Sequence, residues 1–174
     1  MMNFDRNISC CFSGHRKTHF DIDTHFMRKI LKKTIDEAMN QDFQIFYSGM
    51  AMGFDIIAAE AVLERKHAKL VGVIPFYGQE MKWSAKWRTR HDKVLRGADK
   101  IIVLNENYVR GCYHQRNRYL VDHSHRLICF CGNTTGGTAQ TISYAEKAGI
   151  EIVNIWQDLQ AGDKCARMNQ ILEG

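Results

Sequence analysis

Four segments of the chain combine glycine with hydroxyl, basic or acidic residues, and each follows a short apolar run. The segments are Ser13-Gly14-His15-Arg16, residues 48–53, residues 75–80 and Thr134-Thr135-Gly136-Gly137-Thr138. Glycine lets backbone N–H groups approach an anion closely, and the start of a following helix favours negative charge. The hydroxyls of Ser13, Ser48 and Thr138 would donate to phosphate oxygens, and Arg16 can pair with a phosphate through two hydrogen bonds. These residues predict a site for a phosphate-bearing small molecule.

Acidic and amide side chains near these segments are candidates for contacts with the hydroxyls or the base of such a ligand. Asp55 follows Gly53 at an expected helix start, where a carboxylate caps free N–H groups or contacts a ribose hydroxyl. Glu80 lies in a loop and is, with Asp55, a candidate for catalysis. Asn117 lies on an expected polar helix that reaches the ligand or is solvated. The expected ligand-binding residues are Ser13, Gly14, His15, Arg16, Ser48, Gly49, Gly53, Asp55, Pro75, Glu80, Asn117, Gly136, Gly137 and Thr138.

Two common nucleotide-binding fingerprints are absent from the chain. No G-x-G-x-x-G follows the first apolar run, and no G-x-x-x-x-G-K-[ST] occurs anywhere. These absences disfavour dinucleotide redox chemistry and P-loop hydrolysis. The aromatic residues Tyr77, Trp83 and Trp87 flank the third segment, where they stack on a purine or anchor a helix to the core or to a second subunit.

The six cysteines have neither the spacing of a disulfide framework nor that of a zinc knuckle. Cys10, Cys11, Cys129 and Cys131 lie in apolar, strand-like runs, which leaves two interpretations. Their thiolates ligate zinc, or their side chains are buried as small hydrophobic groups. We expect burial, with no metal site and no required cofactor.

The composition is that of a soluble globular domain. The 174-residue chain is 45% hydrophobic and 25% charged, and its formal net charge of +5 favours anionic partners without choosing between a nucleotide and a polynucleotide. The densest basic stretch, residues 82–100, is a solvated helix face or a contact surface for such a partner. No apolar run is long enough to span a bilayer, and the first residues lack the apolar stretch of a signal peptide. We expect a cytoplasmic protein with no membrane partner.

Short apolar runs alternate with helical patterns along the chain. We expect strands at residues 8–12, 43–47, 70–74, 100–104, 126–130 and 150–155, and helices at residues 26–39, 54–67, 84–96, 112–124 and 138–147, with a short tail helix afterwards. Nearly continuous apolar strands belong to a parallel sheet that is covered on both faces. The sequence therefore predicts one α/β domain over residues 1–174, with a doubly wound, mainly parallel, Rossmann-like sheet of five to six strands. Ligands of such sheets bind beyond the carboxyl ends of the strands, where the four segments would meet.

The segments resemble the motifs of the YpsA family, a member of the SLOG superfamily, over about residues 8–155. The residues that carry the resemblance are Cys11-Phe12-Ser13-Gly14-His15-Arg16, Ser48-Gly49-Met50-Ala51-Met52-Gly53-Phe54-Asp55, Pro75-Phe76 with Gln79-Glu80, Arg116-Asn117-Arg118 with Asp122, and Gly136-Gly137-Thr138. The resemblance implies a SLOG-type, Rossmann-like fold and a pocket for a nucleotide or a nucleotide-derived ligand related to ADP-ribose. It also implies a link to bacterial cell division or stress.

Two other groups in that superfamily supply alternatives. LOG phosphoribohydrolases carry a catalytic glutamate after their glycine-rich loop, and Thr141 occupies the matching position here. Because threonine cannot act as a carboxylate acid or base, we expect binding rather than catalysis. The enzymatic alternative is a nucleotide N-glycosidase or phosphohydrolase that uses Glu80 or Asp55. Residues 48–55 also resemble the S-G-x-A-x-G-I-D segment of the DNA-processing protein DprA, so single-stranded DNA binding is a further alternative.

The leading hypothesis from the sequence is a cytoplasmic binding or sensor protein for a nucleotide-like ligand. A homodimer is the expected assembly, since two-fold dimers are the commonest soluble oligomers. Single-stranded DNA binding would instead need the basic stretch and the side chains of Trp83 and Trp87 to line one groove.

Overall fold

Six strands pair side by side in one sheet, and all neighbouring strands run parallel. The computed structural model describes residues 5–16, 25–132 and 134–158. The strands are β1 (Ser9–Gly14), β2 (Ile45–Ser48), β3 (Lys69–Ile74), β4 (Lys100–Val103), β5 (Arg126–Phe130) and β6 (Glu151–Asn154). Their order across the sheet is β4-β3-β2-β1-β5-β6.

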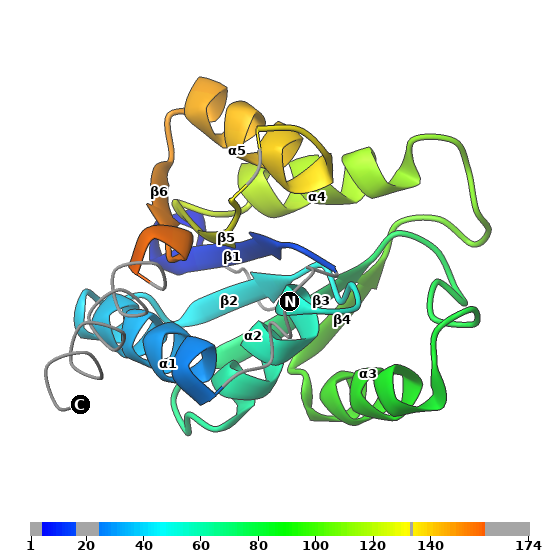
Figure 1. Ribbon diagram of the computed structural model, residues 1–174, viewed down its shortest axis with the longest axis horizontal. Helices are drawn as coiled ribbons and strands as arrows, with labels where there is room; N and C mark the ends of the chain where they lie inside the picture. Colours follow the sequence, from blue (N-terminus) through cyan, green and yellow to red (C-terminus); the bar gives the residue numbers. More distant parts are fainter. Residues whose placement is uncertain (1–4, 17–24, 133, 159–174) are drawn as a thin grey trace, which may run out of the picture.

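Helices cover both faces of this sheet. The helices are α1 (His25–Asn40), α2 (Phe54–Leu63), α3 (Ala85–Gly97), α4 (Cys112–Asp122) and α5 (Gly137–Ala148), and a short 3-10 helix, η1 (Arg6–Ile8), precedes β1. Helices α1, α2 and α3 lie on one face, and α4 and α5 lie on the other (Figure 1). The predicted α/β, doubly wound, Rossmann-like fold is confirmed, with a sheet that is parallel throughout.

Successive residues of the central strand β1 belong to different cores, because side chains alternate across a strand. Cys10 and Phe12 pack in the core under α1, α2 and α3. Cys11 packs in the core under α4 and α5, together with Tyr47 and Leu120. The central strands β1 and β5 bury side chains on both of their faces, so each face of the sheet carries an apolar core.

The same alternation bears on whether the cysteines can ligate a metal ion. Cys10 and Cys11 face opposite sides of the sheet, so their thiols cannot ligate one ion together. Burial raises the pKa of the Cys11 and Cys129 thiols to about 12, which disfavours the thiolate that zinc requires. The five cysteines within the described ranges are buried, and Cys165 lies outside those ranges. The interpretation as small buried side chains therefore fits better than zinc ligation.

Element boundaries differ from the prediction mainly at α2. This helix ends at Leu63 rather than at residue 67, because Arg65 turns back onto α1. Its guanidinium lies 2.6 Å from Asp36 Oδ1 and also donates to the carbonyl oxygen of Lys32. Strand β1 continues two residues further than predicted, to Gly14, where it still pairs with Phe130 of β5. The predicted tail helix falls mostly outside the described residues.

The order of the strands creates one point where connections diverge. From β1 the chain moves through β2 and β3 to β4, and α4 then carries it back to β5 on the other side of β1. Connections that leave β1 and β5 therefore run to opposite faces of the sheet. A crevice opens at such a switch point, beyond the carboxyl ends of the two strands.

The basic stretch at residues 82–100 forms largely an exposed face of α3. Arg90 is the exception, since its Nε lies 2.6 Å from Glu60 Oε1 and its guanidinium covers the ring of Trp87. Trp87 packs against the first core, and the ring of Trp83 meets that of His91 edge-on at 5.3 Å. The two tryptophans therefore anchor α3 to the domain. In the part of the chain that the structure describes, no helix combines the length and apolar character needed to cross a membrane.

His91 predicts a dependence of stability on pH. The side chain is 1% exposed, and within the described residues neither ring nitrogen has a hydrogen-bond partner, although Asp92 Oδ1 lies 3.8 Å from Nδ1. Burial lowers the pKa of His91, against the opposing charges of Glu80 and Asp92. Since the unfolded chain then binds the proton more tightly, the contribution of His91 is fully present above about pH 6.5 and is lost as the pH falls below that value.

We expect His91→Leu to remove this part of the pH dependence. Each unit by which the pKa is lowered is worth about 1.4 kcal/mol of unfolding free energy below pH 6.5. Urea unfolding of the wild type and of H91L at pH 7.5 and pH 5 gives the comparison. A wild type that loses no more stability than H91L on acidification would contradict the prediction.

Candidate functional site

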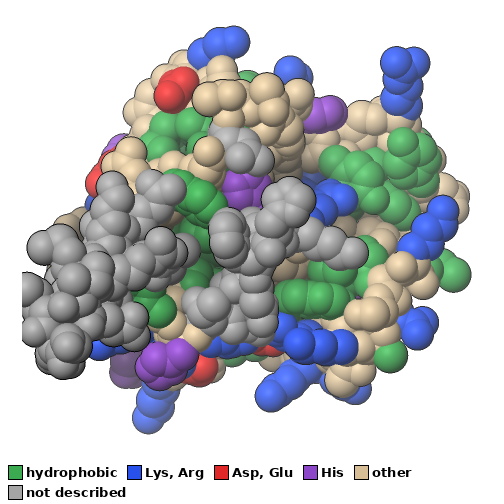
Figure 2. All heavy atoms as spheres, in the orientation of Figure 1, with side chains coloured by type: hydrophobic (Ala, Val, Ile, Leu, Met, Phe, Trp, Pro, Cys, Tyr) green, Lys and Arg blue, Asp and Glu red, His purple; other side chains and the backbone are tan. Residues whose placement is uncertain are grey.

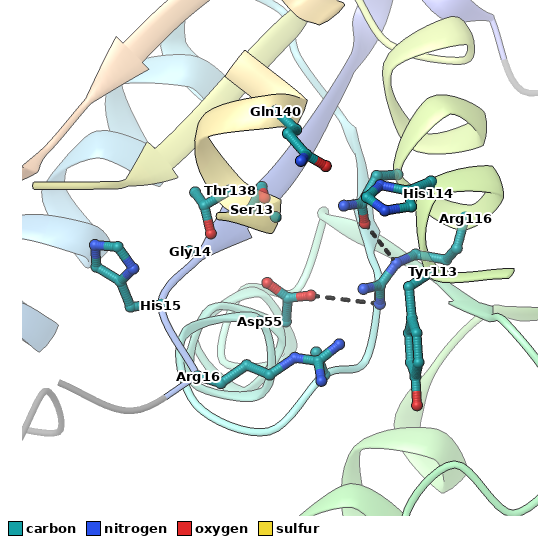
Figure 3. A pocket seen from close by; sticks show the side chains of 13 residues that line it. Ser13, Gly14, His15, Arg16, Asp55, Tyr113, His114, Arg116, Thr138 and Gln140 are labelled. Atoms are coloured by element: carbon teal, nitrogen blue, oxygen red, sulfur yellow. Dashed lines mark hydrogen bonds and ion pairs between the residues drawn. The ribbon is translucent and has the colours of Figure 1, made fainter. Parts of the chain in front are cut away.

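A cavity of about 510 Å³ opens at the switch point. The carboxyl end of β1, the start of α2, the first turns of α4 and the first turn of α5 enclose it (Figure 3). Its lining residues are Ser13, Gly14, His15, Arg16, Ala51, Asp55, Tyr113, His114, Arg116, Asn117, Gly137, Thr138 and Gln140. Within the described part of the chain, Asp55 is the one acidic residue among them.

A buried ion pair forms the floor of this cavity. Asp55, in the first turn of α2, is 5% exposed, and its carboxylate accepts hydrogen bonds from the backbone N–H groups of Gly14 and Ala51. Asp55 Oδ2 lies 3.7 Å from Nη1 of Arg116, which is 4% exposed. Arg116 also donates to the carbonyl oxygen of Gly49, and its Nε donates to Asn117 Oδ1 at 2.8 Å. Three segments of the chain therefore meet on one guanidinium.

The charges of this pair depend on each other. Burial raises the pKa of the Asp55 carboxyl, and the guanidiniums of Arg116 and Arg16 and the two backbone N–H groups oppose the rise. Burial also lowers the pKa of Arg116, while Asp55 opposes that change. A guanidinium keeps its proton in proteins, so the Asp55 carboxylate lies between two cations. In Figure 3 the side chain of Arg116 points toward the Asp55 carboxylate, and that of Arg16 runs past Asp55 toward Tyr113.

The amino end of α5 presents to the cavity backbone donors that have no partner among the described residues. The first N–H groups of a helix have no partner within it, and the first bond in α5 runs from Gln140 N to Gly136 O at 3.0 Å. Gly136, at the N-cap with φ +98°, provides no side-chain cap, and the first turn holds no acidic residue. The helix dipole adds a partial positive charge there. Gly137 and Thr138 therefore form a site suited to an anion.

Arg16 adds a long, positively charged side chain at the mouth of the cavity. Its side chain is exposed, and its guanidinium lies 4.8 Å from the centre of the Tyr113 ring. Within residues 5–16, 25–132 and 134–158, no carboxylate lies within ion-pair distance of Arg16. Within the described residues, a ligand's phosphate can therefore pair with this guanidinium without displacing an acidic side chain.

The structure brings eight of the predicted ligand-binding residues to this cavity. They are Ser13, Gly14, His15, Arg16, Asp55, Asn117, Gly137 and Thr138. The imidazole of His15 points away from Asp55 (Figure 3), and its Nε2 accepts a hydrogen bond from the N–H of Gly132 at 3.1 Å. Burial lowers the pKa of His15, which is consistent with a neutral packing group.

Three further predicted residues lie behind the cavity and shape it. Ser48 is fully buried, where its Oγ donates to the carbonyl oxygen of Asp55 at 3.0 Å. Gly49 lies against the Arg116 guanidinium, and an added Cβ would collide with it. Gly53 has φ +96° and packs on the backbone of His15 and Arg16. These positions support the site instead of lining it.

Pro75, Glu80 and Gly136 are also absent from the lining. The carbonyl oxygen of Pro75 accepts a hydrogen bond from Asn105 Nδ2 at 2.8 Å, away from the cavity. The turn after β3 carries Glu80 toward α3, where its charge acts on His91. Gly136 precedes the first turn of α5 as its N-cap. A catalytic role for Glu80 at this cavity therefore has no geometric support.

Sequence reasoning left Ala51, Tyr113, His114, Arg116 and Gln140 out of the candidate site. Arg116 and Asn117 follow Tyr113 by three and four residues, so both lie on the same face of α4 as Tyr113. That spacing was available in the sequence. The missing information was that α4 crosses back over the sheet and brings this face to the switch point.

The ion pair predicts strongly non-additive effects on stability. Asp55→Ala leaves a buried guanidinium without its carboxylate, and such a change costs roughly 3–5 kcal/mol of unfolding free energy. We expect Asp55→Ala combined with Arg116→Met to cost clearly less than the sum of the single variants, because the double variant buries no charge. Urea unfolding of all four proteins measures this coupling.

The exposed pair of Lys33 and Glu37, 3.5 Å apart on α1, is the matched control. Glu37→Ala should change stability by less than about 1 kcal/mol. Additive losses at Asp55 and Arg116, or a loss at Asp55 no larger than at Glu37, would show that the buried pair does not hold the site together.

Comparison with known proteins identifies the family. The YpsA family model, described as the YspA SLOG family, matches residues 10–156. YoqJ, an uncharacterized SPbeta prophage-derived protein of Bacillus subtilis, is 29% identical in an alignment of 118 residues that covers 59% of this chain and 69% of that protein.

Two solved structures of DNA processing protein A share the fold. The Helicobacter pylori protein superposes with a TM-score of 0.61 at 17% identity, over 95% of this chain and 80% of its own. The Streptococcus pneumoniae protein gives a TM-score of 0.51 at 19% identity, over 88% of this chain and 60% of its own. With the family model matching most of its length, this chain belongs to the YpsA family of SLOG proteins and has the SLOG-type, Rossmann-like fold.

Proposed function

We propose that the switch-point cavity binds the phosphate group of a nucleotide or of a nucleotide-derived molecule such as an ADP-ribose-like compound. The observation that carries this proposal is the meeting of the uncapped α5 start at Gly137 and Thr138, as far as the described residues show, with the Arg16 guanidinium around one cavity. Amides at a helix start and a guanidinium are both strong partners for phosphate oxygens. The volume of about 510 Å³ falls within the usual range for small-ligand sites.

The remaining lining groups suit the sugar of such a ligand. The hydroxyls of Ser13 and Thr138 and the amides of Asn117 and Gln140 offer donors and acceptors. Asp55 supplies a carboxylate, the usual partner of ribose hydroxyls in doubly wound folds. Phosphate and ribose groups would therefore find complementary partners within one cavity.

Binding accounts for these residues better than hydrolysis does. Thr141, at the position of the LOG glutamate, is 2% exposed, and its Oγ1 donates to the carbonyl oxygen of Gly137 at 2.8 Å. Glu80 lies outside the cavity. Asp55 pairs with Arg116, which lowers the basicity of its carboxylate for proton transfer but leaves oxygen lone pairs that can accept from a ribose hydroxyl. We therefore propose a sensor or binding protein, whose cellular role would lie in division or stress.

Location and assembly belong to the same proposal. In the described residues, the buried free thiols of Cys10, Cys11, Cys112 and Cys129 suit a reducing compartment such as the cytoplasm. A homodimer is proposed from the prevalence of two-fold dimers among soluble oligomers.

Arg16→Ala tests the binding proposal. We expect the variant to weaken the binding of AMP about 10- to 100-fold, because a hydrogen bond to a charged group contributes about 1.5–3 kcal/mol. Isothermal titration calorimetry gives the affinities, and chromatography of the mixtures reports any turnover. Arg88→Ala is the matched control, since Arg88 is exposed on α3, outside the cavity. Equal affinities for the two variants, or no saturable binding by the wild type, would refute a phosphate site at Arg16.

A second candidate function, binding of single-stranded DNA, is favoured by a second pocket that continues the first. This pocket, of about 290 Å³, lies between α4 and α5 and shares His114, Asn117 and Gln140 with the cavity. Arg118 and Lys147 line it, and the Arg118 guanidinium lies 5.4 Å from the centre of the Tyr144 ring. Cations next to an aromatic ring are what a single strand requires. The similar Helicobacter pylori protein is described by its single-stranded DNA binding mode.

The double variant Arg118→Ala and Lys147→Ala separates this candidate from the first. If the groove binds DNA, the slope of log affinity for an oligothymidylate against log salt should fall by about 1.4, since each phosphate contact on a single strand contributes about 0.7. AMP binding in the cavity should not change. Fluorescence anisotropy over a salt series measures the slope, and a wild-type affinity that is absent or independent of salt would exclude the groove as a DNA site.

A further inference from the structure

Three aromatic rings gather beside the switch-point cavity. Phe76 follows β3, Tyr108 precedes α4, and Tyr113 lies in the first turn of α4. The ring centre of Phe76 lies 5.5 Å from that of Tyr108 and 5.9 Å from that of Tyr113, and Tyr108 and Tyr113 are 6.5 Å apart. We refer to Phe76, Tyr108 and Tyr113 as the aromatic cluster.

The cluster is continuous with the cavity. Tyr113 belongs to both, because it also lines the cavity. Its ring carries the Arg16 guanidinium at 4.8 Å, and Figure 3 shows the Arg16 side chain extending from the end of β1 between Asp55 and Tyr113. If the phosphate of a ligand pairs with Arg16, the part of the ligand that is attached to this phosphate would therefore reach the aromatic cluster.

Hydrogen bonds hold the segments of the cluster together. Asn105 Nδ2 donates to the carbonyl oxygen of Pro75 at 2.8 Å and to Gln115 Oε1 at 3.0 Å. These bonds link the residue before Phe76, the segment that leads to Tyr108, and the helix that carries Tyr113. The segments that carry the rings are thus held relative to one another before any ligand arrives, which reduces the entropy lost on binding.

The cluster leaves an aromatic face uncovered. Tyr108 is 62% exposed, and the adjacent Val109 is 44% exposed. Figure 2 shows hydrophobic side chains gathered on this face over the segment that enters α4, with basic side chains nearby. An exposed aromatic face next to a cationic site is suited to a flat, electron-rich ring.

We propose that the aromatic cluster is the subsite for the nucleobase of the ligand, which stacks on Tyr108 while the phosphate lies between Arg16 and the start of α5. This inference rests on the proposed function and deepens it, since it makes the ligand a nucleotide with an accessible base rather than a sugar phosphate. Stacking tolerates any base because every base has a flat face. The proposal therefore assigns selectivity for nucleotides over sugar phosphates, and no preference among the bases.

The experiment compares two probes that differ by the base, AMP and ribose 5-phosphate, on three variants. We expect Tyr108→Ala to weaken AMP binding roughly 5- to 100-fold, as the loss of one base-stacking contact does, and to leave ribose 5-phosphate within about twofold. Tyr108→Phe keeps the ring and should keep the affinity for AMP. Tyr77→Ala is the matched control, because Tyr77 is 66% exposed and lies outside the cluster. Calorimetry gives the affinities, and circular dichroism checks that each variant is folded.

The possible outcomes distinguish a failure of the base subsite from a failure of the proposed phosphate site. Equal weakening of both probes by Tyr108→Ala, or unchanged AMP binding, would overturn the base subsite while leaving the phosphate site intact. AMP that binds the wild type no more tightly than ribose 5-phosphate would also overturn it. A wild type that binds neither probe would remove the proposed function and the base subsite together.

Discussion

The site depends on one interaction, the buried pair of Asp55 and Arg116. Either charge alone would be costly in the interior, so the two side chains must meet, and their meeting fixes α2 against α4. Arg116 also binds the carbonyl oxygen of Gly49, which leaves no room for a side chain at that position. The pair thus sets the floor of the cavity and the place from which Tyr113, one turn earlier on α4, reaches its mouth.

Among the helix starts that line the cavity in the described residues, those of α2 and α5 both follow a glycine-containing loop but differ in how they receive an anion. At α2, the N–H of Phe54 donates to the carbonyl oxygen of His15, and Asp55 already places a negative charge there. At α5, the first turn has neither an acidic residue nor a side-chain cap. A phosphate would meet repulsion at α2 and attraction at α5. The fold therefore distinguishes two ends that look alike in sequence, since both follow a glycine-containing loop.

The parallel sheet and most of the cavity could be predicted because their signals are local. Apolar runs marked the strands, and Ser13, Gly14, Arg16, Gly137 and Thr138 lie directly after strands or at a helix start, which the order of elements brings to one edge. Glu80 lies outside the lining of the cavity, because the turn after β3 leads it toward His91, and nothing in the sequence of its loop shows that direction. The gathering of Tyr108 and Tyr113 beside the cavity could not be predicted, because it depends on α4 crossing to the far side of β1 and because their contact with Phe76 joins residues over thirty positions apart. Likewise, the sequence allowed Trp83 and Trp87 to stack on a purine, whereas packing on α3 and the core engages both.

The most direct measurement is a two-dimensional ¹⁵N NMR titration of the whole chain with AMP, observing backbone amides and arginine Nε–H groups together. An anion held at the start of α5 should shift the amides of Gly137 and Thr138 and the Arg16 Nε–H most strongly, with saturation at a single affinity. The amide signals of α3, which lies on the other face of the sheet from α5, should keep their chemical shifts. Largest shifts on α3, or unshifted signals at Gly137 and Thr138 while AMP binds, would contradict the account.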